Sequence, residues 1–249
     1  MTRIESMACT HVGRRSNNED SHCSCPELGL FAVADGMGGY EGGEIASRLT
    51  VTALVQFFQR NADDDEATWP FGMDPTLSFV ENMVRVAVRI AHQEICDHKR
   101  GSLAHMGSTV AAVAFVGATA VIAHVGDSRV YRLRDGELRQ LTRDHSLYAE
   151  MQATGMGDLP DRGSCGFANV ITRALGMPAS EPDLAHEPLQ AGDTYLLCTD
   201  GLVERLDDNA IASHLAAPPD RACPLLVERA YELGGRDNIT AIVVRVVET

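Results

Sequence analysis

The chain has 249 residues, of which 45% are hydrophobic and 22% are charged. That length and apolar content allow one buried core and exclude a disordered chain. The formal net charge of −14, without any block of Lys or Arg, excludes a protein that binds along the phosphate backbone of a nucleic acid.

Composition also bears on location and redox chemistry. No apolar run reaches the roughly 18 to 20 residues that a membrane span needs. Residues 1–9 lack the apolar core of a secretory signal. We therefore expect a cytoplasmic monomer with one domain over residues 1–249 and no membrane segment. The seven cysteines lack the paired spacing of a zinc site, so we expect free thiols.

The first half of the chain predicts one buried strand followed by two helices. The apolar run at residues 28–34 predicts a strand that delivers Asp35 to a glycine-rich turn at residues 36–39. Residues 44–60 and 77–98 place apolar side chains at helical spacing. The intervening residues 61–75 are rich in Asp and Pro, which predicts a loop.

The second half begins with short β-prone runs at residues 108–116, 119–125, 130–133 and 138–141. Asp135-Gly136 is a strong hairpin signal between the last two, and we interpret the four runs as an antiparallel meander. Residues 145–154, 208–215 and 221–233 predict helices, and residues 194–199 and 239–247 predict strands. Because helices and strands come in separate runs, antiparallel sheets covered by helices are favoured over a doubly wound parallel sheet.

Four acidic turns share one pattern, in which an apolar strand or its approach meets Asp beside Gly. They contain Asp35, Asp127, Asp200 and Asp237. Any one of these pairs is explained by an ordinary turn, since Gly accepts positive φ and Asp caps its own backbone. Together they suggest that carboxylates converge at strand ends, where they would supply the hard oxygen ligands that Mg²⁺ or Mn²⁺ require.

A fifth acidic position lies near the start of the chain, where Arg15 precedes Asp20. A guanidinium can hold a phosphate through two hydrogen bonds, and Asp20 could bind a metal or its water. A solvated, charged turn explains the same residues, and the pattern does not separate the two interpretations.

The sequence resembles the PPM family of protein phosphatases, the protein phosphatase 2C type, in its bacterial form. The resemblance runs through nearly the whole chain and is carried by motifs in the order of the family. They are residues 13–20 (GRRSNNED), 33–39 (VADGMGG), 106–109 (MGST), 125–129 (VGDSR), 141–146 (LTRDHS), 171–176 (ITRALG), 197–202 (LCTDGL) and 235–240 (GRDNIT).

The resemblance implies an α+β fold, with a central antiparallel β-sandwich flanked by helices on both faces. It also implies a binuclear Mn²⁺ or Mg²⁺ centre with a third cation nearby. Asp35 would bridge the two metals, the Gly36 carbonyl would bind one of them, and Asp200 and Asp237 would bind the other. Asp20 would hold a metal-bound water, and Arg15 would bind the phosphate. Bacterial relatives often bind a third cation, and here Asp127 would hold it together with Asp200.

The function implied is hydrolysis of phosphoserine and phosphothreonine in proteins by a metal-activated water, with phosphorylated proteins as substrates, a Ser/Thr kinase among them. This fits the residues independently, because two cations can activate water and offset phosphoryl charge without a covalent intermediate. Two alternatives stay open. One is a catalytically silent regulator that binds phosphoproteins, and the other is a phosphatase of small phosphoesters.

The chain departs from the family at one catalytic position. Some members of the family carry a His directly after the Asp-Gly of the second motif, proposed there as general acid, whereas this chain has Met37 after Asp35-Gly36. No proton donor to the leaving group can therefore be assigned. For His145 a capping or structural role is favoured over catalysis. Residues 145–170 correspond to the family's flap, and the glycines at residues 155–166 suit motion, although an ordinary exposed loop fits equally well.

Overall fold

Two antiparallel sheets pack face to face in the computed structural model, which describes every residue except 1, 40, 63–68, 156–158, 161–164 and 249. One sheet runs in the order β1 (Thr2–His11), β11 (Ile239–Glu248), β10 (Thr194–Cys198), β7 (Arg129–Arg134) and β8 (Glu137–Gln140). The other runs in the order β2 (Asp20–Cys25), β3 (Leu30–Met37), β5 (Val110–Val116), β6 (Thr119–Val125) and β9 (Asp183–Pro188), and β4 (Gly107–Ser108) pairs with β3.

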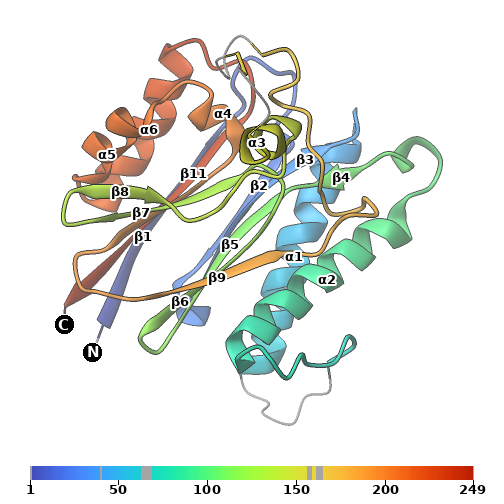
Figure 1. The fold of residues 1–249 in the computed structure, drawn as a ribbon, viewed down its shortest axis with the longest axis horizontal. Coiled ribbons are helices and arrows are strands. Elements are labelled where there is room, and N and C mark those ends of the chain that lie inside the picture. The colour runs from blue at the N-terminus through green and yellow to red at the C-terminus, as the bar shows by residue number, and fades with distance from the viewer. Residues whose placement is uncertain (1, 40, 63–68, 156–158, 161–164, 249) are drawn as a thin grey trace.

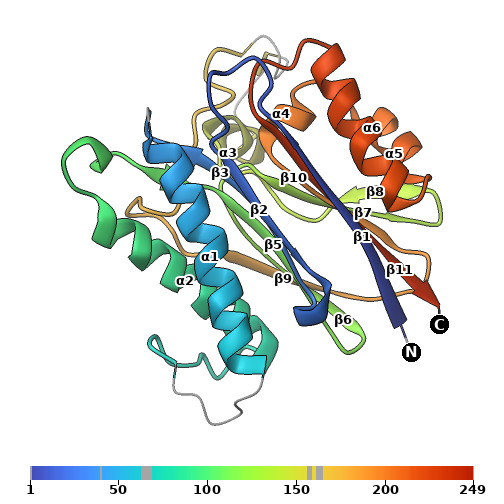
Figure 2. The same cartoon turned by 180° about the vertical axis from the view of Figure 1, so that it is seen from behind.

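Helices cover the outer faces of both sheets. They are α1 (Gly42–Ala62), α2 (Phe79–His98), α4 (Asp200–Val203), α5 (Asp208–Leu215) and α6 (Pro219–Glu232). A further short helix, α3 (Leu147–Ala153), follows β8 in the chain. Helices α1 and α2 lie on the sheet that contains β3, and α5 and α6 lie against the sheet that contains β11, as Figures 1 and 2 show from opposite sides. The predicted α+β sandwich with helices on both faces is confirmed.

Three apolar layers follow from this arrangement. Between the sheets, Phe115 packs edge-on against Phe31 and Tyr195, with ring centroids 5.6 and 5.2 Å apart. The second layer fills the space under α1 and α2, and the third lies between the other sheet and α5 and α6. Because β3 and β10 are buried on both faces, their residues are apolar almost throughout, and that is the pattern that made them readable in the sequence.

The predicted helices are confirmed with small shifts at their ends. Helix α2 begins at Phe79 rather than at residue 77 because Ser78 is its N-cap: the Ser78 hydroxyl accepts from the Glu81 amide, and the Glu81 carboxylate accepts from the Ser78 amide. The predicted strand ending at Asp35 continues to Met37, and the turn comes afterwards at Gly38 and Gly39, which have φ of +131° and +71°.

The predicted meander is wrong in one respect. Strands β5 and β6 pair in one sheet, whereas β7 and β8 pair in the other, joined through Asp135 and Gly136 with φ of +51° and +81°. The chain changes sheets at residues 126–128, where Gly126 has φ of +106°. Hydrophobic alternation does not show which sheet a strand joins. The sequence pattern alone therefore places all four strands in one sheet.

Two expectations concern the whole chain. All seven cysteines are free thiols, as predicted. In the part of the chain that the structure describes, no helix is long and apolar enough to cross a membrane.

Candidate metal centre

The predicted carboxylates come together from five separate segments at one end of the sandwich. Asp20 begins β2 and lies directly opposite Asp35 of β3 in the strand register. Asp200 follows β10 as the first residue of α4, Asp237 lies in the turn before β11, and Asp127 lies in the turn between β6 and β7. Like charges opposite one another destabilise a sheet, so the pairing of Asp20 with Asp35 needs a positive partner or a proton.

The pKa values of these groups show how strongly the carboxylates repel one another. The pKa of Asp35 is raised well above its ordinary value, first by withdrawal from water and then by the charges of Asp20, Asp200, Asp127 and Asp237. Withdrawal from water, followed by the charges of Asp127 and Asp237, likewise raises the pKa of Asp200. For Asp20, withdrawal from water raises the pKa to about 7, although hydrogen bonds from Thr240 and Thr199 oppose the shift. All five carboxylates therefore share one electrostatic field.

Two oxygen atoms of the cluster have no hydrogen-bond partner within the described residues. They are Oδ1 of Asp20 and Oδ1 of Asp200, and both are buried. Leaving such an atom unsatisfied costs about 1–3 kcal/mol, more when it is charged. A divalent cation with a preference for oxygen ligands would satisfy these atoms and offset the repulsion. The residues present therefore fit the Mn²⁺ or Mg²⁺ ions that the sequence predicts.

The backbone around Asp35 is held by residues that sequence reasoning noted only as motif members. The Asp35 amide donates to the Thr109 hydroxyl over 2.9 Å, and the Thr109 amide donates to the Asp35 carbonyl over 2.8 Å. The Thr109 hydroxyl lies 2.7 Å from that of Ser128. Thr109 thus connects Asp35 in β3 to the turn that carries Asp127.

Asn238 supports the opposite side of the centre, and it too was missed. Its side-chain oxygen accepts from the Glu19 amide over 2.7 Å, and its side-chain nitrogen donates to the carbonyls of Val12 and Asn17. The amide of Asn238 donates to the Asp237 carboxylate over 2.9 Å. Buried Asn238 therefore fixes the loop of Arg15 against the turn of Asp237. In the sequence, only the position of Asn238 beside Asp237 pointed to a role in the site. The partners of its side chain lie more than 200 positions away.

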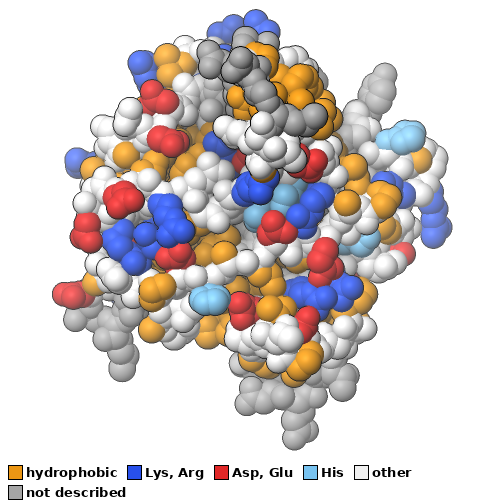
Figure 3. Space-filling view, viewed as in Figure 1, with side chains coloured by type: hydrophobic (Ala, Val, Ile, Leu, Met, Phe, Trp, Pro, Cys, Tyr) orange, Lys and Arg blue, Asp and Glu red, His pale blue; other side chains and the backbone are white. Residues whose placement is uncertain are grey.

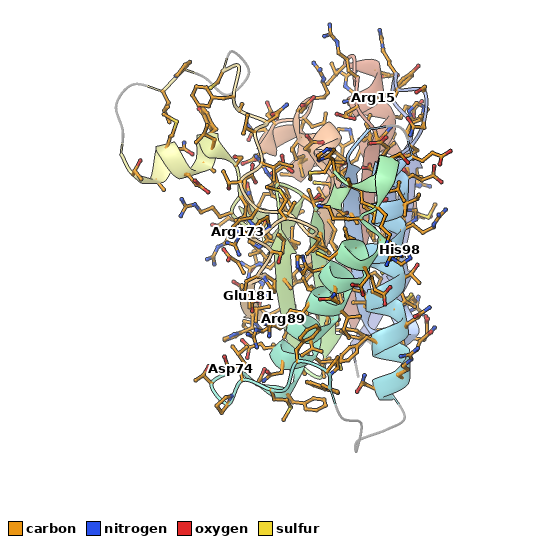
Figure 4. All side chains as sticks on the ribbon, turned by 90° about the vertical axis from the view of Figure 1, so that its right-hand side faces the viewer. Arg15, Asp74, Arg89, His98, Arg173 and Glu181 are labelled. Atoms are coloured by element: carbon orange, nitrogen blue, oxygen red, sulfur yellow. The ribbon has the colours of Figure 1, made fainter. Side chains whose placement is uncertain are left out.

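A cavity of about 460 Å³ opens beside the carboxylates. Its wall includes Arg15, Asp35, Gly36, Met37 and Asp237. The Arg15 guanidinium donates to the Asp237 carboxylate over 2.7 Å, and its side chain is 57% exposed, which leaves most of it accessible to a ligand in the cavity. Figure 4 labels Arg15 at the upper end of the molecule.

Gly36 is required by a close approach of two backbones. A Cβ at this position would lie 1.9 Å from the Gly43 carbonyl oxygen of α1 and 2.8 Å from that of Glu19. We expect Gly36→Ala to lower the melting temperature by about 2–12 °C, because overpacking of this kind costs about 1–3 kcal/mol. Gly166→Ala is the control, since a Cβ there meets nothing within 4 Å. Equal losses in both variants would contradict this reason.

The predicted flap at residues 145–170 is only partly visible. Residues 156–158 and 161–164 lie outside the described residues. Its two ends are paired, since Ser146 and Ile171 form an isolated bridge and the Leu147 amide donates to the Val170 carbonyl over 2.9 Å.

Several known proteins are similar to this chain in sequence and fold. A family model described as Protein phosphatase 2C matches residues 9–219. The serine/threonine protein phosphatase PstP of Mycobacterium tuberculosis is 37% identical over 94% of this chain, which spans 43% of that relative's length. The serine/threonine phosphatase Stp of Listeria monocytogenes is 34% identical, over 86% of this chain and 83% of the relative.

One solved structure bears directly on the metal centre. It is the catalytic domain of a serine/threonine protein phosphatase PstP in complex with two manganese ions, which superposes with a TM-score of 0.84 at 34% identity and covers 100% of both chains. The model match extends over most of the sequence, and the fold agrees throughout. This chain belongs to the protein phosphatase 2C family.

Proposed function

We propose that this chain hydrolyses phosphoserine and phosphothreonine monoesters in proteins, with Mn²⁺ or Mg²⁺ held by the carboxylate cluster. The observation that carries the proposal is the convergence of Asp20, Asp35, Asp200 and Asp237 beside a cavity that also exposes Arg15. Unsatisfied buried oxygens on Asp20 and Asp200 support cation binding. The Listeria relative, which matches this chain over most of the length of both proteins, is named a serine/threonine phosphatase.

We assign the residues as follows. Asp35 would bridge two cations, the Gly36 carbonyl would serve one, and Asp200 and Asp237 would serve the other. Asp20 would hold water near them, and Asp127 would serve a third cation. When bound, the cations would lower the pKa of a water molecule and offset the charge on the phosphoryl oxygens.

The chain's own groups orient the substrate. The Arg15 guanidinium can donate two parallel hydrogen bonds to phosphoryl oxygens, and it lies in the same cavity wall as Asp35. Asp20 accepts from the Thr199 hydroxyl over 2.9 Å, which fixes the carboxylate opposite Asp35. Met37 stands in the cavity wall but has no proton to give the leaving hydroxyl.

The proposal is tested by comparing a phosphothreonine peptide, p-nitrophenyl phosphate and a panel of small phosphate metabolites, each with Mn²⁺, Mg²⁺ or a chelator. We expect hydrolysis that requires a divalent cation, with kcat/KM on the peptide well above that on any metabolite. Activity confined to metabolites would favour a phosphatase of small phosphoesters. Peptide binding without turnover in Mn²⁺ would favour the silent regulator. Opposition to a Ser/Thr kinase, the single domain, the monomeric state and the cytoplasmic location stay predictions.

Replacing Arg15 by alanine tests its phosphate role. A hydrogen bond to a charged group contributes about 1.5–3 kcal/mol, so we expect Arg15→Ala to lower kcat/KM by about 10- to 100-fold. Mn²⁺ affinity should not fall, because Arg15 supplies no cation ligand. Arg14→Ala is the matched control, since Arg14 is exposed and stands outside the cavity wall formed by the described residues. Equal kcat/KM in the two variants would remove Arg15 from substrate binding.

A further inference from the structure

The turn between β6 and β7 is held on both sides by two consecutive residues, Asp144 and His145. The His145 amide donates to the Gly126 carbonyl over 2.8 Å, and the Gly126 amide donates back to His145 Nδ1 over 3.0 Å. On the other side of the turn, Asp144 accepts two hydrogen bonds of 2.8 Å from the Arg129 guanidinium. Asp127 lies between these two attachments.

The attachment is buried and therefore rigid. Asp144 and His145 are only 7% and 6% exposed, and Asp127 is 1% exposed. A bidentate pair between Arg and a carboxylate fixes geometry as well as charge. The His145 ring stacks on His124 with centroids 4.5 Å apart and an interplanar angle of 19°. The backbone of Asp127 therefore has little freedom to turn its carboxylate away from the cluster.

The outer side of the His145 ring is held in turn by Asp183 and Arg173. His145 Nε2 lies 3.1 Å from Asp183 Oδ2, and Arg173 donates to Asp183 Oδ1 over 2.8 Å. Figure 3 shows histidine, basic and acidic side chains together near the middle of this face. Arg173 is labelled well away from Arg15 in Figure 4. In the described part of the chain, the wall of the cavity beside Asp35 includes neither Asp144 nor His145.

His124, His145 and Asp183 place ligand atoms within 4.8 Å of one another, which is close enough for a metal ion. Two observations argue against one. Because the Gly126 amide must donate, Nδ1 of His145 accepts, so a neutral ring carries its proton on Nε2 and donates it to Asp183. The Arg173 guanidinium also lies 2.9 Å from Nε2, where its charge would repel a cation. We interpret these residues as support for the His145 ring.

We propose that Asp144 and His145 form a clasp that positions Asp127 as a ligand for a third divalent cation. The proposal rests on the proposed function, since it presumes the cation centre of Asp35 and Asp200. It assigns a role to the motif at residues 141–146 and makes His145 a positioning residue, which touches neither substrate nor the reacting atoms. It also connects the base of the segment at residues 145–170 to the metal centre through hydrogen bonds that the structure contains.

Mn²⁺ titration of the whole chain without substrate tests the clasp, with binding followed by calorimetry and by the paramagnetic resonance signal of free Mn²⁺. We expect two tightly bound ions and one weaker ion, and Asp127→Asn should lose only the weaker one. His145→Gln keeps a polar group near Asp183 but offers no acceptor at the Nδ1 position. It should raise the dissociation constant of the weaker ion by about 10- to 100-fold, as loss of a supporting hydrogen bond does at other metal sites.

His145→Asn is the matched rescue, because its side-chain oxygen can stand where Nδ1 accepts from Gly126, and we expect the weaker ion to bind within about threefold of wild type. Should His145→Gln fail to fold by circular dichroism, Asp144→Asn supplies the same test through Arg129. An unchanged weaker site in the variants, an equal loss in His145→Asn, or no third ion in wild type would overturn the clasp alone. Absence of the two tight ions would overturn it together with the proposed function.

Discussion

Replacing Asp35 by asparagine is expected to abolish cation-dependent phosphatase activity while leaving the fold intact. Asp35 is the carboxylate whose pKa is raised by all four of the others, so it lies where their charges meet. A cation at such a site contributes several kcal/mol to stabilising the charge that develops during the reaction. Loss of about 4 kcal/mol corresponds to a rate lower by about a thousandfold. The measurement is kcat on a phosphothreonine peptide at saturating Mn²⁺.

The control for this variant is Asp135→Asn, which makes the same chemical change in the hairpin between β7 and β8. Asp135 is exposed and adopts φ of +51°, a conformation that asparagine also tolerates. We expect its activity to equal that of wild type. If Asp35→Asn retained more than about a tenth of wild-type kcat, Asp35 could not be the residue that bridges the cations.

The strands that stand out most clearly in the sequence are those buried on both faces, whereas the edge strand β8 was predicted from the Asp-Gly hairpin signal before it. Leu30 to Ala34 of β3 and Tyr195 to Cys198 of β10 are buried and mostly apolar, so both runs stood out from their surroundings. Strands β1, β2 and β9 were missed, because each has a face open to water or lies at a sheet edge. Strand β9, for example, contains Asp183, His186 and Glu187. Its strand structure comes from pairing with β6, which no local pattern in the sequence records.

The same distinction applies to the centre. Four of the five aspartates were readable because glycine lies beside or near them at the end of an apolar strand or its approach, and Asp20 was readable because Arg15 precedes it. The order of the motifs also matches a family. Their supports were not readable. Thr109 and Asn238 bond to residues 74 and up to 226 positions away, so only the assembled fold shows what they do. His145 was expected to be structural, and its two bonds to Gly126 show which part of the structure it holds.

Removing cations is expected to lower stability, and the loss should grow as the pH rises. In the cation-free native state the pKa of Asp20 is raised to about 7, and those of Asp35 and Asp200 are also raised. These groups keep protons that the unfolded chain, with ordinary pKa values near 4, has already released. The native state then binds more protons than the unfolded state, so the free energy of unfolding falls as the pH rises from about 4 through about 7.

Mn²⁺ should reverse this trend, because it binds the deprotonated carboxylates and therefore binds more tightly at higher pH. At a hundredfold excess over its dissociation constant, one bound ion adds about 2.7 kcal/mol, or about 5–10 °C of melting temperature for a chain of this size. Thermal melts in chelator and in Mn²⁺ at pH 5.5 and 7.5 measure both effects. His145 opposes the trend at acid pH, since burial lowers its pKa to about 4 and its contribution is lost as the pH falls below about 6.5.

The Asp35→Asn variant distinguishes repulsion among the carboxylates from a general effect of pH on the stability of the protein. Asparagine does not ionise, so it removes the free-energy cost that the raised pKa of Asp35 imposes at pH 7.5. In chelator at that pH the variant should therefore melt above wild type, although it should gain less from Mn²⁺. Asp35 would then lower the stability of the cation-free protein and yet be required for activity. This combination is expected where like charges are held together to bind cations. If wild type and Asp35→Asn melt together in chelator and respond equally to Mn²⁺, the carboxylates do not share a cation centre.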